Sequence, residues 1–319
     1  MAVASFLKKN NLVEGDVVEL TKDGSLFVGT IIPSPDPSCV VLKLKSGYNA
    51  GFLPESVSAV RRLSKGTAVS KPPAKDLKPN SLLPTILILH TGGTIASRVD
   101  YRTGAVVASF DPADMITMFP KLAQIANFES HLVANMMSED LRVGHYAFLA
   151  ESIGKELKKN PALKGVIISH GTDTLAYTSA ALAFAVSNCP VPVLLVGAQR
   201  SSDRGSSDAQ DNLVAAATFI VKSDFAGIAL CMHDSESDDW CAILPACKTR
   251  KMHTSRRDAF KPINDTVIAR VNAFTGEIVY VKPDYPRASK IPLEIKSDFE
   301  EKVALVKTHP NFHAEQLEP

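Results

Sequence analysis

The sequence lacks the features that mark nucleic-acid-binding, membrane and secreted proteins. Its formal net charge is only +1 over 319 residues, so no overall basic field would attract nucleic acid. No apolar stretch approaches the length of a membrane span. The N-terminus also lacks the basic region, apolar core and cleavage site of a secretory signal. These absences predict a globular, cytoplasmic protein with no membrane contact.

Familiar metal and cofactor motifs are also missing. The five cysteines form no Cys-x-x-Cys pair, which favours free thiols in a reducing cytosol over a disulfide or zinc framework. No His, Asp or Glu cluster has zinc spacing, so we interpret His170 and His253 as structural histidines and predict no metal on this chain. The acidic stretch 234–239 reads as an exposed loop, with a calcium site as the weaker alternative. Serine-hydrolase elbows, Walker loops and dinucleotide fingerprints are absent, which disfavours those enzyme classes.

The composition changes three times along the chain. Residues 1–63 alternate short β-rich runs with turn residues, a pattern that predicts a small antiparallel, barrel-like domain. Residues 64–82 are rich in Lys, Pro and Ser, as an exposed linker would be. Residues 83–283 repeat strand, loop and helix, and residues 284–319 begin with a Pro- and Lys-rich stretch. We therefore expect two folded domains joined by a linker.

The part from 83 to 283 predicts an α/β domain. Apolar runs at 86–89, 166–169, 193–196 and 227–232 indicate buried strands, and 175–187 and 213–221 indicate helices between them. This alternation predicts a mostly parallel sheet flanked by helices. Residues 267–271 and 278–281 predict a late hairpin. Ser297 and Glu300 have the spacing of a capping box, which predicts a helix through Val306.

Two Gly-Thr segments follow apolar runs and give the strongest functional signal. They read Thr91-Gly92-Gly93-Thr94 and His170-Gly171-Thr172-Asp173-Thr174. Ligands of open α/β sheets bind beyond the carboxyl ends of the strands, so both loops can place hydroxyls and backbone N–H groups around one small molecule. A threonine hydroxyl needs a nearby proton acceptor before it can act as a nucleophile. Tyr101 could relay a proton from Thr94, and a lysine of the segment 248–261 could complete a Thr-Lys-Asp relay with Thr172 and Asp173.

Each of these features also has a purely structural interpretation. Thr-Gly-Gly-Thr alone could be a tight turn with a helix cap, and Asp173 could cap the helix that starts near Leu175. The basic run 248–261 could be a solvated face, as most charge runs are. The occurrence of two threonine loops at strand ends favours the catalytic interpretation.

The motifs together resemble the type I/II L-asparaginase family over residues 83–283. The residues that carry this resemblance are the two threonine motifs, Tyr101, Ser138-Glu139-Asp140, Val196-Gly197-Ala198-Gln199-Arg200 and the lysine segment. The small front domain and the run from Lys251 to Phe260 look more narrowly like the archaeal-type glutamyl-tRNA(Gln) amidotransferase D subunits. This resemblance implies that Thr94 is the nucleophile with Tyr101 as its proton relay. It also implies that Thr172, Asp173 and Lys251 form a second relay, and that Ser138, Glu139 and Asp173 bind the substrate's α-carboxylate and α-amino group.

The resemblance further implies a glutaminase that releases ammonia for a partner, the amidotransferase E subunit, which converts Glu-tRNA(Gln) to Gln-tRNA(Gln). This chain would need no cofactor, whereas the partner would use ATP and Mg and bind most of the tRNA(Gln). A heterotetramer is implied, with a homodimer through the asparaginase-like domain and a second such domain starting within residues 284–319. A free-standing cytosolic L-asparaginase with an accessory domain is the nearest alternative. A non-catalytic tRNA-docking protein that uses Arg256 and Arg257 is a further one.

Overall fold

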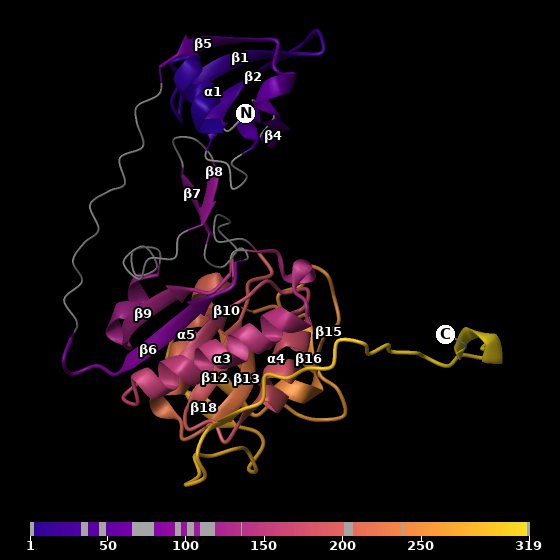
Figure 1. Ribbon diagram of the computed structural model, residues 1–319. Helices are drawn as coiled ribbons and strands as arrows, with labels where there is room; N and C mark the ends of the chain where they lie inside the picture. Colours follow the sequence, from indigo (N-terminus) through magenta and orange to yellow (C-terminus); the bar gives the residue numbers. More distant parts are fainter. Residues whose placement is uncertain are drawn as a thin grey trace.

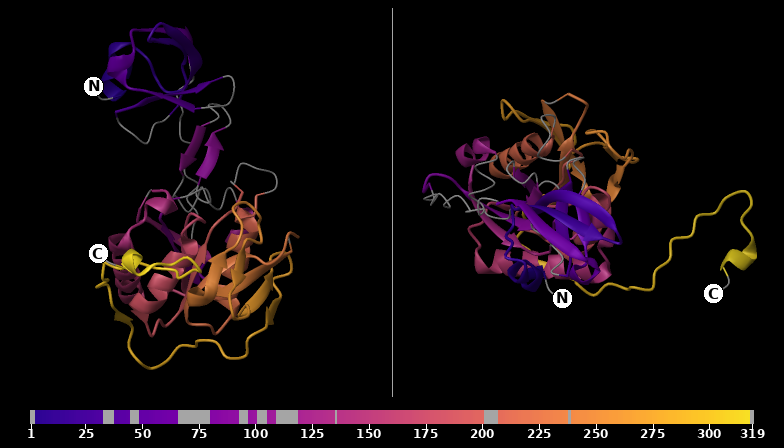
Figure 2. Two further views of the ribbon diagram at one scale, coloured as in Figure 1. Left: turned by 90° about the vertical axis from the view of Figure 1, so that its right-hand side faces the viewer. Right: turned by 90° about the horizontal axis from the view of Figure 1, so that it is seen from above.

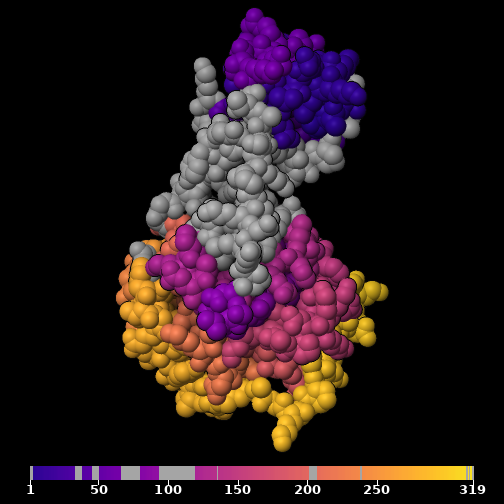
Figure 3. Space-filling model, turned by 90° about the vertical axis from the view of Figure 1, so that its left-hand side faces the viewer, coloured from indigo at the N-terminus to yellow at the C-terminus, as the bar shows by residue number. Residues whose placement is uncertain are grey.

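The computed structural model describes residues 3–32, 38–44, 49–65, 80–92, 97–100, 105–108, 119–134, 136–200, 207–237 and 239–317. Figures 1 and 3 show a small N-terminal domain in indigo to purple and a larger body coloured from purple through orange to yellow. In the described part of the chain, no helix is long and apolar enough to cross a membrane.

The small domain is a five-stranded antiparallel sheet in the order β4-β3-β2-β1-β5. Val18 and Leu20 of β1 are buried and the residues on either side of each are less so, as expected for a strand with one face on a core. That core includes Leu20 and Leu42, and Phe6 of the N-terminal helix packs into it. The elements are α1 (Val3–Lys9), β1 (Val17–Lys22), β2 (Ser25–Ile32), β3 (Val40–Leu44), β4 (Asn49–Phe52), η1 (Pro54–Ser56) and β5 (Ala59–Ser64).

The larger body is built on an eight-stranded sheet in the order β18-β17-β14-β13-β12-β10-β6-β9. The pairs from β9 to β13 are parallel, and those from β13 to β18 are antiparallel. The predicted α/β class, with a small β domain in front of a mostly parallel sheet, is confirmed. The strands are β6 (Thr85–His90), β9 (Asn127–Leu132), β10 (Gly165–Ser169), β12 (Pro192–Val196), β13 (Gly227–His233), β14 (Trp240–Pro245), β17 (Ala269–Asn272) and β18 (Ile278–Tyr280).

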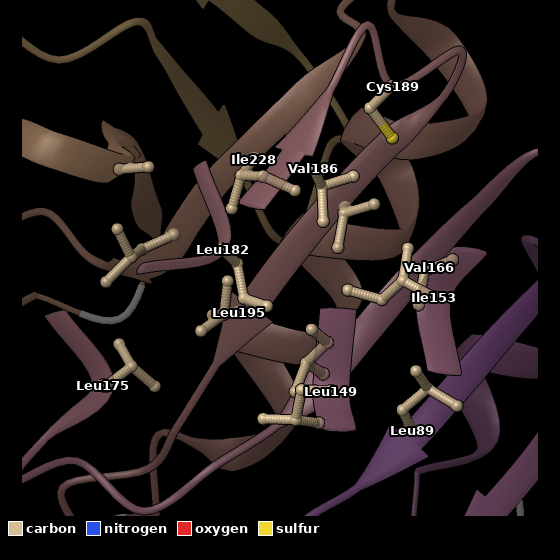
Figure 4. Packing of buried hydrophobic residues seen from close by; sticks show 14 of the residues in the cluster. Leu89, Leu149, Ile153, Val166, Leu175, Leu182, Val186, Cys189, Leu195 and Ile228 are labelled. Carbon is tan, nitrogen blue, oxygen red and sulfur yellow. The ribbon is translucent and has the colours of Figure 1, made fainter. Parts of the chain in front are cut away.

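Helices cover both faces of this sheet (Figures 1 and 2). One face packs on α5 (Ala209–Lys222), where alternate strand residues such as Ile167 and Leu194 meet the helix. The other face packs on α3 (Val143–Lys159) and α4 (Leu175–Ala185). Figure 4 shows Val166 and Leu195 of the sheet among helix side chains of this second cluster. Burial on both faces explains why these strands are continuous apolar runs.

The remaining elements of the chain are short. Two of them, β15 (Thr249–Lys251) and β16 (Phe260–Pro262), form the hairpin that carries the lysine segment. The others are β7 (Ser97–Asp100) paired with β8 (Ala105–Ala108), β11 (Val186–Ser187) paired with β19 (Glu294–Ile295), η3 (Pro120–Gln124), η4 (Ser138–Asp140), η5 (Ala246–Lys248) and η6 (Ala314–Leu317).

The helix predicted from Ser297 through Val306 is wrong. The Ser297 hydroxyl donates to Glu151 Oε1 at 2.9 Å instead of capping a helix, and the segment up to 308 has no regular structure. Figure 2 shows the C-terminal segment running away from the body, and Val303 is 76% exposed. An isolated short helix is unstable in water. Phe299 packs on the cluster of α3 and α4, but the apolar residues that follow it, Val303, Leu305 and Val306, are exposed.

Two other elements differ from the prediction. The helix predicted over 175–187 ends at Ala185, and the next two residues form β11 because they pair with Glu294 and Ile295. Helix α3 was not predicted, although Leu149, Ile153 and Leu157 are buried at a helical spacing of four. The late hairpin is present as β17 and β18.

Candidate active site

The site lies at the carboxyl ends of β6, β10 and β12. These strands pair in parallel register, with His90 opposite Ser169 and Ser169 opposite Val196, so the loops that follow them leave the sheet together. The backbone N–H and the hydroxyl of Thr91 both donate to Ser169 O, at 3.2 and 3.0 Å. The first Gly-Thr segment is therefore attached to the strand that leads into the second.

The start of the first Gly-Thr segment requires a glycine. Gly92 has a φ of +109°, and a Cβ there would stand 2.5 Å from Met136 O. Thr94 and Tyr101 lie outside the described residues, so their roles stay predictions. The described residue nearest to Thr94 on its N-terminal side, Gly92, follows the carboxyl end of β6, beside the strand that leads to Thr172.

Lys251 brings two of the predicted site residues together. Its Nζ donates to Thr172 Oγ1 and to Asp173 Oδ1, each at 2.8 Å. The Lys251 side chain is 13% exposed, whereas that of Asp173 is 62% exposed. A mostly buried ammonium thus contacts one hydroxyl and one carboxylate that faces the solvent. This arrangement can transfer a proton to or from Thr172 while the carboxylate stabilises the charged amine.

Asp173 does not cap α4 in this structure. The residue before the helix is Thr174, whose hydroxyl donates to Ser138 O at 2.7 Å and accepts no capping hydrogen bond from the helix N–H groups. This bond holds the second threonine loop against η4. Ser138 is buried and its hydroxyl lies 3.4 Å from Glu139 Oε2, and Glu139 is exposed. Ser138, Glu139 and Asp173 therefore lie around one loop, in positions from which they could contact a small amino acid.

The basic run 248–261 is a structured hairpin and not a uniformly solvated face. Phe260 is buried opposite Lys251, and Met252 N donates to Ala259 O at 2.7 Å. Arg256 binds Asp258 with two hydrogen bonds of 2.8 and 3.0 Å. The hairpin is thus closed by its own residues and directs Lys251 toward Thr172.

The described part of the acidic stretch follows β13, and Glu236 meets this hairpin. Asp234 Oδ2 accepts from Arg270 at 2.7 Å, and Arg257 donates to Glu236 O at 2.6 Å. Within the described residues no group of three or more His, Cys, Asp or Glu could hold a metal ion.

His170 has a structural role beside Thr172. It is buried, with Nδ1 at 2.7 Å from Gly171 O and Nε2 at 2.9 Å from Thr178 Oγ1. The carbonyl can only accept, so Nδ1 carries the proton and Nε2 accepts from the threonine. Burial lowers the pKa of His170 to about 4, although the bond to the Gly171 carbonyl opposes this shift. The imidazole is therefore neutral at neutral pH.

A buried polar network lies behind the site, and the sequence patterns did not predict it. Asp208 accepts hydrogen bonds from the backbone N–H groups of Gln199 and Arg200, at 3.1 and 2.9 Å. Asn212 donates to Asp208 at 3.1 Å and accepts from His233 at 2.7 Å. The sequence signal is an Asp and an Asn four residues apart at the start of an apolar helix, which by itself only suggests a cap.

Comparison with known proteins finds a matching family model for each of the two domains. The family model described as "Asparaginase, N-terminal" matches residues 85–284, and that described as "GatD N-terminal domain" matches residues 12–63. The D subunit of the glutamyl-tRNA(Gln) amidotransferase from Pyrococcus furiosus is 43% identical over 326 aligned residues, which cover 100% of this chain and 74% of that protein. The D subunit from Methanococcus maripaludis is 40% identical, and the match covers 95% of this chain and 72% of that protein.

A solved structure agrees with this assignment. The thermostable L-asparaginase from Thermococcus kodakarensis superimposes with a TM-score of 0.61 and 29% identity, covering 73% of this chain and 66% of its own. Similarity to asparaginases concerns the larger domain, whereas the match of residues 12–63 concerns the small front domain. The chain therefore belongs to the family of glutamyl-tRNA(Gln) amidotransferase D subunits, and its larger domain is asparaginase-like.

Proposed function

We propose that this chain hydrolyses the side-chain amide of glutamine and supplies the ammonia to a partner subunit that amidates Glu-tRNA(Gln). The observation that carries the proposal is the double contact of Lys251 Nζ, 2.8 Å from both Thr172 Oγ1 and Asp173 Oδ1. Family membership supports the tRNA-dependent role, because the D subunits match the whole chain including the front domain.

In the proposed reaction, the Thr94 hydroxyl attacks the amide carbon, and its proton passes through the Tyr101 phenol, which accepts it while giving up its own. The carbon–nitrogen bond of the tetrahedral intermediate then breaks, and the leaving nitrogen receives a proton and departs as ammonia. Thr172 can deliver that proton and regain one from Lys251, whose ammonium is stabilised by Asp173, and the proton released from Thr94 then restores the lysine. Water hydrolyses the resulting ester, which returns free Thr94 and glutamate.

The substrate contacts follow from the same loop. Asp173 is 62% exposed and can bind an α-ammonium group, with Glu139 beside it. The Ser138 hydroxyl can donate to the α-carboxylate. Glutamine and asparagine differ by one methylene, which a pocket discriminates by only about 1–3 kcal/mol. Both amides are therefore compared in the assay.

The second half-reaction is assigned to a partner, the amidotransferase E subunit. Free ammonia is protonated in water and lost, so its producer and its user must form a tight complex. In this proposal the partner activates the glutamyl carboxyl with ATP and Mg and binds most of the tRNA(Gln). A complex with two copies of each protein is the expected assembly, in the cytoplasm.

Two copies of this chain would meet through the asparaginase-like body. Helix α4 contains no charged residue, and helices that are apolar on every side are normally covered by protein. Nevertheless Tyr177 is 61% exposed, Phe184 72%, and Phe148 of α3 52%. These three aromatic residues support a homodimer. Replacing Phe184 by serine should weaken the dimer in analytical ultracentrifugation, and an unchanged sedimentation profile would contradict this contact.

The test of the function uses the purified protein with its partner subunit and Glu-tRNA(Gln). Wild type should release ammonia from glutamine faster in the presence of partner and charged tRNA. Thr94→Val and Thr172→Val should each abolish release, whereas Thr30→Val, a matched change within β2 of the small domain, should leave it unchanged. Strong asparagine hydrolysis without the partner would instead indicate a free-standing L-asparaginase. Normal activity of either site variant would exclude the proposed threonine chemistry.

A further inference from the structure

One side chain joins the loop behind Thr172 to the loop that follows Lys251. The amide Nε2 of Gln199 donates to Arg256 O at 2.8 Å and lies 3.4 Å from both His253 O and Thr254 O. One donor group thus faces three carbonyl oxygens of a single turn. Gln199 is half-buried and follows the carboxyl end of β12, the strand next to β10.

The Gln199 backbone is itself fixed from inside the protein. Its N–H donates to the buried carboxylate of Asp208 at 3.1 Å, and Arg200 N donates to the same carboxylate at 2.9 Å. Asn212 Nδ2 donates both to Asp208 and to Gly197 O, at 3.1 and 3.0 Å. Buried, fully bonded groups of this kind specify one conformation. The loop 197–200 is therefore a rigid base from which the Gln199 amide extends.

The same loop touches the site directly. A Cβ at Gly197 would stand 2.8 Å from Thr172 Cγ2. Gln199 thus links the backbone that supports Thr172 to the turn that immediately follows Lys251. The turn is also attached on its outer side by Arg257 to Glu236 O and by Arg256 to Glu236 Oε1, at 2.6 and 3.4 Å. Arg256 and Glu236 are 49% and 73% exposed, and an ion pair between such exposed groups contributes little.

We propose that Gln199 is a positioning residue for the amidase reaction, which uses its amide N–H groups to hold the turn 253–256 so that Lys251 reaches Thr172 and Asp173. This inference rests on the proposed function, because the lysine matters only if the relay operates. Among the described residues, its side chain bonds the turn 253–256 and none of Thr172, Asp173 and Lys251. A displacement of about 1 Å in such a support can cost about 100-fold in rate.

Two substitutions of Gln199 distinguish a role as hydrogen-bond donor from a role in filling space. Gln199→Glu keeps the shape but replaces the donor by an acceptor that faces three carbonyl oxygens. Gln199→Met keeps the length and removes the polarity. Gln124→Met, at an exposed position of η3, is the matched control. Both Gln199 variants should leave the hydrophobic core between α5 and the sheet intact.

The first measurement is hydrogen exchange by mass spectrometry on the full protein. Both Gln199 variants should speed exchange within 249–262 about tenfold or more, including the Met252 N–H that donates to Ala259 O, with exchange in α5 unchanged. The control variant should match wild type. Unchanged exchange in this hairpin would overturn the proposal, and so would equal acceleration throughout the domain.

The second measurement is glutamine hydrolysis in the complex with the partner subunit. Both variants should lower kcat about 10- to 100-fold and change KM less than about threefold, with Gln199→Glu at least as impaired as Gln199→Met. Wild-type kcat in Gln199→Glu would overturn the donor role. Absence of amidase activity in the wild-type complex would refute the proposed function, while the exchange result would still decide whether Gln199 holds the turn.

Discussion

Replacing Lys251 by methionine removes the ammonium and keeps most of the side-chain length. The variant loses two hydrogen bonds of 2.8 Å, one to Thr172 and one to Asp173. If the lysine acts only in a structural ion pair, the cost appears in stability. If it takes part in proton transfer, the cost appears in the rate.

The two costs differ enough to be separated. Asp173 is 62% exposed, so solvent screens its ion pair with Lys251 and the loss of stability should be about 0–1 kcal/mol. For a domain of this size that lowers Tm by at most about 4 °C. Loss of a positioned acid–base group typically costs about 10²- to 10⁴-fold in rate, or about 3–5 kcal/mol of transition-state stabilisation.

The assay is ammonia release from glutamine by the complex with the partner subunit, together with thermal unfolding of each variant. Lys282→Met is the matched control, because the Lys282 Nζ forms an ion pair of 2.9 Å with Asp265 and, among the described residues, no hydrogen bond to Thr172 or Asp173. We expect full activity in the control and at least a 100-fold loss in Lys251→Met. Retention of more than about a tenth of wild-type turnover by Lys251→Met would refute the relay.

Three further predictions concern the surroundings of the site. Gly197→Ala places a Cβ 2.8 Å from Thr172 Cγ2 and 3.1 Å from His170 O, and we expect it to lower kcat about 10-fold or more. A Cβ added at Gly144 meets no atom within 4 Å, so Gly144→Ala should leave kcat unchanged, and equal kinetics of the two variants would contradict this packing. Arg256 holds the pKa of Asp258 down at about 2, so Asp258 stabilises the fold above its ordinary pKa of 3.8 and loses this effect as the pH falls toward 2. Urea unfolding of Asp258→Asn should therefore show a deficit of about 1 kcal/mol at pH 6 that shrinks below pH 4, and a deficit independent of pH would argue against the pair. Burial holds the pKa of His170 at about 4, so this residue binds more protons in the unfolded chain between pH 6.5 and 4 and by itself should lower the free energy of unfolding by about 2–3 kcal/mol over that range, in addition to the fall from His90, whose pKa burial also lowers to about 4. In His170→Gln the free energy of unfolding should fall less steeply with decreasing pH. An unchanged pH dependence would show that His170 is not a buried, neutral imidazole in the folded protein.

The sequence by itself determined the strands and helices whose local pattern of apolar residues shows which side chains are buried. Apolar runs at β6, β10, β12 and β13 are strands because both faces of a central parallel sheet are covered, so no polar face interrupts them. The threonine loops follow two of these strands, and the carboxyl ends of parallel strands lie at one edge. The sequence therefore placed Thr172 and Asp173 at the crevice.

Only the tertiary structure decided which distant groups meet there. Lys251 is 79 residues from Thr172 along the chain. The charge pattern alone left every lysine of the run 248–261 as a candidate and only the family resemblance singled out Lys251, whereas the folded hairpin places its side chain at Thr172. The capping-box pattern at Ser297 failed for a related reason. A helix there needed a surface to pack on, and the Ser297 hydroxyl binds Glu151 instead. A local sequence pattern shows which secondary structures a segment can form, whereas contacts between distant segments decide which of these structures is stabilised. The hydrogen bond between the Gln199 amide and the turn 253–256 is such a contact.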